Sequence, residues 1–186
     1  MPLEQWTEIV RFGKRIVQAG LTSSRFGNIS LLRGNDIIIT RTGSLLDELD
    51  GDQIIDVDLS GPCPKDKIAS TEVCVHRAIY NKTSAKAVIH THSPYAVALS
   101  LIEDEIEPID SEGKHFLGPM PVVDGSFGTD ILAENVSSAL MDHSACIARG
   151  HGAFAAGKSL TEAYTIACMA EHSSQVRYLV MVYKND

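Results

Sequence analysis

Two histidines stand one residue apart in the stretch AVIHTHSPYA, which runs from Ala87 to Ala96. The apolar residues before them predict a buried strand over residues 85–91, and side chains in a strand alternate between its two faces. His90 and His92 are therefore expected on the same face, about 7 Å apart along the strand. Zinc binds histidine nitrogens at roughly 2.0–2.1 Å, so this spacing allows both imidazoles to reach one metal ion.

A catalytic zinc ion commonly has three protein ligands and one open position, so a third ligand is needed. His151 is the best candidate, because the glycines on both sides of it in ARGHGAF allow a bend that turns the imidazole inward. A position near a helix end explains His143, and surface or packing positions on helices explain His76 and His172. His115 lies in a polar loop and has no assignment.

The H-x-H pattern taken alone also suits two polar side chains on a solvated face of a strand. The same pattern is found in amidohydrolases, but those enzymes are barrels of about 250 residues or more. This chain has 186 residues, which is too short for such a barrel. The prediction of a metal site therefore depends on further motifs in the chain.

Length and composition predict one compact domain that spans residues 1–186. Hydrophobic residues make up 44% of the chain, and we find no internal repeat, low-complexity tract or linker between domains. The formal net charge of -8 disfavours non-specific binding to nucleic acid, which needs clustered Lys and Arg. No apolar run approaches the length of a membrane span, so no membrane partner is expected.

The four cysteines are widely spaced and form no C-x-x-C pair. The first ten residues, MPLEQWTEIV, lack the basic and apolar segments of a secretory signal. Both observations predict a reduced, cytoplasmic protein. A small anionic ligand is compatible with the negative net charge, because backbone N–H groups and a metal ion act locally.

Periodicity and capping residues place these side chains on alternating helices and strands. Ser70 is predicted to cap a helix that starts at Thr71, with Glu72 in its first turn. Helices are predicted at residues 3–19, 71–81, 94–102, 129–141 and 159–183. Strands are predicted on both sides of a turn at 33–36, and at 54–57, 85–91, 106–109, 121–123 and 145–149. The hairpin and the short strands favour an α/β fold with a central, mostly antiparallel sheet covered by helices on both faces.

Five short motifs follow one another along the chain: GNIS at 27–30, TRTG at 40–43, STE at 70–72, HTH at 90–92 and GHG at 150–152. On these motifs the sequence resembles the class II aldolase/adducin family, most closely its members that act on L-fuculose 1-phosphate. The resemblance covers nearly the whole chain, in the same order and with similar intervals. It implies the class II aldolase-like α/β fold in a single domain.

The resemblance implies a site with one Zn²⁺ ion per subunit, held by His90, His92 and His151. Glu72 beside the metal would be the acid/base that moves protons. The implied reaction is the reversible cleavage of a ketose 1-phosphate, such as L-fuculose 1-phosphate, into dihydroxyacetone phosphate and an aldehyde such as lactaldehyde. Zinc would stabilise the enediolate that forms when the carbon–carbon bond breaks.

The phosphate pocket of the family falls on residues that donate hydrogen bonds without carrying a charge. A glycine allows close approach of the backbone, and a helix N-terminus favours an anion. Each of these residues taken singly has an ordinary alternative as a turn, a helix cap or a junction between a loop and a strand. The implied phosphate ligands are Asn28, Thr42, Gly43, Ser70 and Thr71.

Three features depart from the pattern of the L-fuculose phosphate enzymes. Thr71 stands where those enzymes have a second serine, a change that keeps the hydroxyl. The catalytic tyrosine of the family has no counterpart, because no tyrosine occurs between Tyr95 and Tyr164. The chain ends at Asp186, without the longer tail that covers a neighbouring subunit's site in the bacterial enzyme. These departures leave the aldehyde product open.

Other functions on the same scaffold stay open at this point. They are the 4-epimerisation of a pentulose 5-phosphate, the dehydration of methylthioribulose 1-phosphate, and a non-catalytic interaction module like the adducin heads. Glu72 favours an aldolase or a dehydratase, because the similar epimerases carry the shorter Asp at this position. The presence of all three histidines opposes the non-catalytic module. A Schiff-base aldolase is a further alternative, which borohydride trapping would detect.

The resemblance also implies a homotetramer with active sites at the subunit interfaces. Loop residues such as Glu112, His115 and Phe127 are candidates to serve the site of a neighbouring subunit. The expected substrate is a small phosphorylated sugar.

Overall fold

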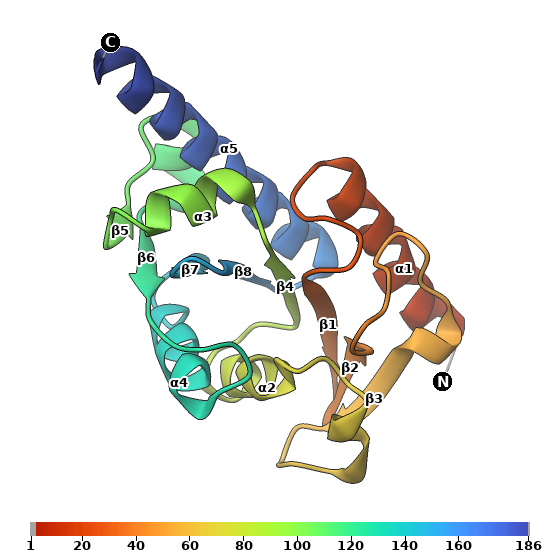
Figure 1. Cartoon of the computed structure of the whole chain (residues 1–186). Coiled ribbons are helices and arrows are strands. Elements are labelled where there is room, and N and C mark those ends of the chain that lie inside the picture. Colours follow the sequence, from red (N-terminus) through yellow and green to blue (C-terminus); the bar gives the residue numbers. More distant parts are fainter. Residues whose placement is uncertain (1–2, 186) are drawn as a thin grey trace.

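The computed structural model describes residues 3–185, and within them one sheet of eight strands forms the centre of the molecule (Figure 1). The strand order is β3-β2-β1-β4-β8-β7-β6-β5. Neighbouring strands are antiparallel, except that β6 and β7 are parallel. The predicted mostly antiparallel sheet is therefore confirmed. The strands are β1 (Asn28–Arg33), β2 (Asp36–Thr40), β3 (Ile54–Asp58), β4 (Ala87–Thr91), β5 (Glu105–Ile106), β6 (Met120–Val123), β7 (Ala145–Ala148) and β8 (Gly152–Gly157).

Helices cover both faces of this sheet, as predicted (Figure 1). Apolar side chains of α2 (Val73–Lys82) and α4 (Asp130–Ala139) form one buried layer. Those of α1 (Leu3–Gln18), α3 (Pro94–Ser100) and α5 (Leu160–Asn185) form the layer on the opposite face. Short helical turns lie at Gly51–Gln53, Pro64–Lys67 and Gly113–Leu117. Within residues 3–185, no helix is both long and apolar enough to cross a membrane.

The register of β1 against β4 decides which side chains share a face of the sheet. Asn28 pairs with His90 and Ile29 pairs with Ile89. Because side chains alternate along a strand, the two isoleucines enter the layer beneath α1, α3 and α5. Asn28 and His90 project from the opposite face, toward α2. This polar pair is thereby placed on the face of the sheet that α2 and α4 cover.

Helix α2 begins two residues later than predicted. Its first residue is Val73, and Glu72 occupies the position before it without capping the helix through its side chain. The Ser70 hydroxyl instead accepts a hydrogen bond of 3.3 Å from the Glu72 backbone N–H. The prediction that Ser70 caps a helix starting at Thr71, with Glu72 in its first turn, is therefore wrong. The Glu72 carboxylate consequently points toward the sheet rather than back at its own helix.

One predicted strand is shorter than expected, whereas the two predicted caps of α4 and α5 are present. The strand predicted at 106–109 has only two residues, Glu105 and Ile106, which pair with β6. The side chain of Thr129 caps α4 as expected, by accepting from the backbone N–H of Leu132. At the start of α5, Ser159 accepts from the backbone of Glu162, whose carboxylate accepts from the N–H of residue 158. The predicted capping box is thus present as a variant, in which the Glu162 carboxylate accepts from the residue before the N-cap rather than from the N-cap itself.

Candidate active site

Three histidines from separate parts of the chain meet at one end of β4. His90 lies in β4, His92 directly after it, and His151 in the turn that joins β7 to β8. One ring nitrogen from each lies within 4.8 Å of the other two, a group that could hold a metal ion. The ring centroids are 4.7 to 4.9 Å apart. The structure therefore brings together the three residues predicted as metal ligands, and their role as ligands stays a prediction.

The tautomer of His90 is fixed by the neighbouring strand. Its ring is fully buried, and Nδ1 lies 3.0 Å from the backbone oxygen of Ala153. A carbonyl oxygen only accepts, so Nδ1 carries the proton and Nε2 presents a lone pair. This is the arrangement by which proteins orient a histidine that binds a metal.

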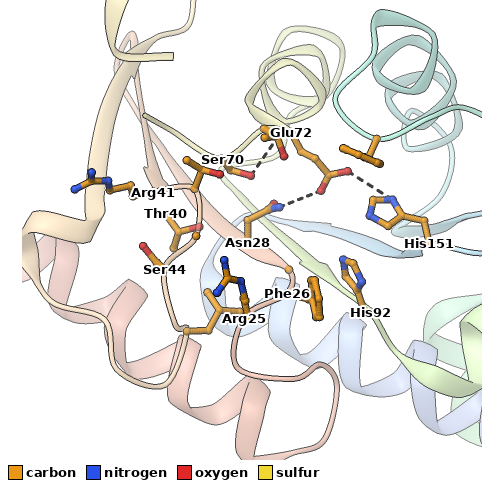
Figure 2. A pocket seen from close by; sticks show the side chains of 16 residues that line it. Arg25, Phe26, Asn28, Thr40, Arg41, Ser44, Ser70, Glu72, His92 and His151 are labelled. Carbon is orange, nitrogen blue, oxygen red and sulfur yellow. Dashed lines mark hydrogen bonds and ion pairs between the residues drawn. The ribbon is translucent and has the colours of Figure 1, made fainter. Parts of the chain in front are cut away.

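The Glu72 carboxylate lies directly beside these rings (Figure 2). Its Oε2 is 3.2 Å from His90 Nε2, and its Oε1 is 3.7 Å from His151 Nδ1. Oε1 and both of these nitrogens are buried and have no hydrogen-bond partner. A lone pair facing a carboxylate oxygen at this distance is unfavourable unless a cation lies near both. The donor set of this site therefore fits a divalent metal ion.

Burial keeps two of the three imidazoles neutral at physiological pH. Burial, reinforced by the nearby His151 ring, lowers the pKa of His92 to about 4. The same two causes lower the pKa of His90 well below its usual value. Metal binding requires a deprotonated imidazole, so both rings are ready to act as ligands without releasing a proton.

Beside the histidines lies a pocket of about 400 Å³. Every residue predicted to bind phosphate lines it, in the company of Glu72, His92 and His151. Thr40, Arg41 and Ser44 line the end opposite the two histidines (Figure 2). The structure thus joins the five predicted phosphate ligands to the histidine cluster in one cavity. These five are Asn28, Thr42, Gly43, Ser70 and Thr71.

The pocket also contains residues that the sequence analysis did not assign. Arg25 brings positive charge to its wall, and the exposed ring of Phe26 stacks on His92 at 5.3 Å between centroids. Phe127, a candidate for a neighbouring subunit's site, lines the pocket of its own chain. The position of Arg25 and Phe26 directly before the GNIS motif was the available signal.

A chain of buried polar groups leads away from Glu72 through β1 and α2. Asn28 Nδ2 donates to Glu72 Oε2 at 3.0 Å, and Asn28 Oδ1 contacts His76 Nε2. His76 Nδ1 lies 2.6 Å from the Ser30 hydroxyl, which lies 2.6 Å from the Tyr80 hydroxyl. His76 is fully buried, so of the two positions expected for it the packing position is the one found.

Burial of His76 makes the stability of the protein depend on pH. Burial lowers the pKa of His76 to about 3, against an ordinary value of 6.5. Below pH 6.5 the unfolded chain therefore binds a proton at His76, whereas the folded chain does not. This contribution to the free energy of unfolding is fully present above pH 6.5 and is lost as pH falls toward 3. Between pH 6.5 and 4.5, we expect wild type to lose roughly 2–3 kcal/mol more than His76→Gln. Urea unfolding across this range measures the difference, and parallel curves would contradict it.

Two glycines allow the strands around the site to approach each other. A side chain at Gly152 would place its Cβ 2.2 Å from the Thr91 backbone oxygen and 2.8 Å from the His90 ring. A Cβ at Gly27 would lie 2.5 Å from the His90 backbone oxygen, and Gly27 has a φ of +84°. The glycines of the GNIS and GHG motifs thus leave room for the segment that carries His90.

Replacement of Gly152 by alanine is expected to push β8 away from the end of β4. We expect Gly152→Ala to lower the free energy of unfolding by roughly 1–3 kcal/mol and to weaken metal binding, because His90 must shift. Gly61→Ala is the matched control, since no atom lies within 4 Å of the added carbon. Urea unfolding and metal analysis of both variants test this, and wild-type values for Gly152→Ala would refute the steric argument.

The fold and the site together define a protein of the class II aldolase type, and comparison with known proteins agrees. The family model described as "Class II Aldolase and Adducin N-terminal domain" matches residues 7–178. The chain belongs to this family. The structure of L-fuculose-1-phosphate aldolase from Thermus thermophilus is similar, with a TM-score of 0.92 and 34% identity, and the match covers 97% of this chain and 96% of that one.

The names of the curated relatives describe two types of reaction, aldol cleavage and decarboxylation. An L-fuculose phosphate aldolase from Methanococcus maripaludis is 38% identical over 156 residues, which cover 83% of this chain and 85% of that protein. A 3-oxo-tetronate 4-phosphate decarboxylase from Pectobacterium atrosepticum is 34% identical over 164 residues, which cover 84% of this chain and 75% of that protein. Both names refer to phosphorylated sugar derivatives.

Proposed function

We propose that this protein is a metal-dependent aldolase that reversibly cleaves a ketose 1-phosphate, such as L-fuculose 1-phosphate. The products are dihydroxyacetone phosphate and an aldehyde such as lactaldehyde. The observation that carries the proposal is the joining of three histidines and a carboxylate to one pocket that is also lined by uncharged donors and Arg25. The names of the aldolase relatives support it.

His90, His92 and His151 would hold the metal ion, which we take to be one Zn²⁺ per subunit. When bound, such an ion supplies Lewis-acid polarisation of a substrate carbonyl and its neighbouring hydroxyl. The histidine side chains contribute uncharged nitrogens, so the site keeps the positive charge of the ion for the substrate oxygens. The Ala153 carbonyl orients the His90 ring for this task.

Glu72 moves the proton that the reaction requires. Cleavage between C3 and C4 of the ketose turns the C4 hydroxyl into the aldehyde carbonyl, so this hydroxyl gives up its proton. The bonding electron pair stays on C3, which must then gain a proton. Among the described residues that line the pocket, Glu72 is the only carboxylic acid. Its Oε2 is held by Asn28, while Oε1 has no hydrogen-bond partner and is free to exchange a proton with C3. In the synthetic direction, the same oxygen removes that proton.

The uncharged donors that line the pocket suit the phosphate group. Thr42, Ser70 and Thr71 offer hydroxyls, and Gly43 has a φ of +75° with open space around its α-carbon. The N-terminus of α2, directly after Glu72, also favours an anion. Arg25 adds a positive charge, although the net charge of the chain is negative.

An aldol assay tests the proposal. Dihydroxyacetone phosphate is offered with a panel of aldehydes to the metal-loaded protein, and product formation is compared with and without EDTA. We expect condensation with at least one aldehyde and its loss on chelation. Full activity in EDTA, combined with inactivation by borohydride in the presence of substrate, would instead indicate a Schiff-base aldolase. A metal-free protein of normal stability and no activity would favour the non-catalytic module.

Decarboxylation is a second candidate, favoured by the decarboxylase among the relatives. Loss of CO₂ from a 3-oxo acid phosphate also leaves an electron pair on the carbon next to a carbonyl. The same ion and the same Glu72 proton would serve that reaction. Release of CO₂ from 3-oxo-tetronate 4-phosphate, without activity toward any aldehyde, would select this candidate.

We further propose a cytoplasmic homotetramer with active sites at its subunit interfaces. Exposed apolar side chains along the end of α5 support association between subunits, and the four free cysteines support a reducing compartment. Light scattering during size-exclusion chromatography measures the mass. The exposed residues of α5 include Tyr178, Leu179, Val180, Val182 and Tyr183.

A further inference from the structure

The buried polar chain behind Glu72 has a fixed direction. An ionised carboxylate only accepts hydrogen bonds, so Asn28 must turn its NH₂ group toward Glu72, as it does at 3.0 Å. Its Oδ1 then faces His76 Nε2 and only accepts. Nε2 of His76 therefore carries the ring proton. The Glu72 carboxylate thus fixes the orientation of the Asn28 amide, and the amide oxygen in turn fixes the tautomer of His76.

The other side of the imidazole continues the same direction. Burial holds the pKa of His76 at about 3, so the ring is neutral and Nδ1 accepts. The Ser30 hydroxyl, 2.6 Å away, donates to it. The single proton of Ser30 is then used, so the Tyr80 hydroxyl at 2.6 Å donates to Ser30. Every donor in this chain points toward Glu72.

We propose that His76 is a positioning residue, which locks the Asn28 amide so that its NH₂ group holds the reactive carboxylate of Glu72 in place. The inference deepens the proposed function and rests on it. His76 lines neither the pocket nor the histidine cluster, and it acts through Asn28. Asn28 also lines the pocket, where its second N–H remains available for a substrate oxygen. The active site would therefore depend on a residue that contacts neither the substrate nor the metal ion.

Packing alone does not account for polar groups at these positions. Ser30 and His76 are fully buried, next to the apolar layer beneath α2 and α4. Apolar side chains of similar size would fill such space at comparable or greater stability. The arrangement instead satisfies each group and ends at the one carboxylate of the pocket. A role in orienting that carboxylate explains why polar residues occupy this part of the layer.

A tautomer measurement tests the arrangement without any need for turnover. Two-bond ¹H–¹⁵N spectra of zinc-loaded protein labelled in its histidines distinguish the two neutral tautomers, and the His76 signal is the one that disappears in His76→Gln. We expect a neutral ring with the proton on Nε2. A proton on Nδ1, or a charged ring at neutral pH, would overturn the proposal.

A double-mutant cycle on kcat/KM then tests whether His76 acts through Asn28. We expect His76→Leu and Asn28→Ala each to lower kcat/KM by about 30- to 100-fold, and the double variant to fall no more than about 3-fold below either one. His76→Gln can still donate to Asn28 and is expected to stay within about 5-fold of wild type. Metal content should remain unchanged in all of these variants.

The outcomes separate the two proposals. Multiplying losses in the double variant, or a His76→Gln protein as impaired as His76→Leu, would show that His76 acts only through packing. A wild-type protein with the predicted tautomer but without lyase activity would overturn the proposed function alone. Loss of metal in His76→Leu would contradict the inference, because the effect would then pass through the ligands and not through Asn28.

Discussion

Glu72→Gln is expected to lower kcat by about 10²–10⁴-fold and to leave the metal in place. Glutamine has the same shape and keeps an oxygen that can accept from Asn28, so the hydrogen bond of 3.0 Å can survive. The amide neither gains nor loses a proton near neutral pH, so it cannot act as an acid or base toward the substrate carbon. Turnover in the aldol assay and metal content by elemental analysis measure the two effects on one sample.

The matched control is Glu134→Gln, on the outer side of α4. Glu134 is exposed and pairs with Lys82, so its replacement is expected to leave stability and activity nearly unchanged. If Glu72→Gln retained its metal and stayed within about tenfold of wild-type turnover, the role of Glu72 as the acid/base would be wrong. If it lost the metal, Glu72 would be a ligand as well.

Removal of the metal is the second change with a large expected effect. Replacing a residue that only hydrogen-bonds to a metal ligand weakens metal affinity by about 10–100-fold. His92→Ala removes a ligand itself, so we expect it to weaken metal affinity by more than about 100-fold. His92 is suited to this test because its ring is only partly buried, whereas His90 lies inside the sheet. Turnover should fall in parallel with metal content.

The control for this variant is His143→Ala. His143 bonds the backbone oxygen of Pro119 and does not belong to the histidine cluster, so its loss is expected to keep both metal and turnover. EDTA treatment of wild type should abolish turnover, and added Zn²⁺ should restore it. A His92→Ala protein with wild-type metal affinity would exclude His92 as a ligand.

The part of the site that local geometry dictates was predictable from sequence. The two-residue period of a strand places His90 and His92 together, and glycines flanking His151 indicate a turn that admits an imidazole. The central antiparallel sheet followed from a hairpin signal and several short strands. Each of these inferences needs only a few neighbouring residues.

The part that depends on packing between distant segments was not predictable. The chain of bonds from Tyr80 to Glu72 requires the register of β1 against β4 and the depth at which α2 packs on them. His76 therefore looked like an ordinary helical histidine. The start of α2 was misplaced for the same reason, because the Glu72 carboxylate gains its partners from Asn28 on β1 rather than from its own helix.

The central claim is that three imidazoles from separate segments hold a divalent cation beside Glu72. X-ray absorption at the metal edge of the purified, active protein tests it most directly. For zinc, we expect histidine-type scattering from nitrogens at about 2.0–2.1 Å and its loss in His92→Ala. Sulfur ligands at about 2.3 Å, which would place the ion on cysteines, would contradict the account.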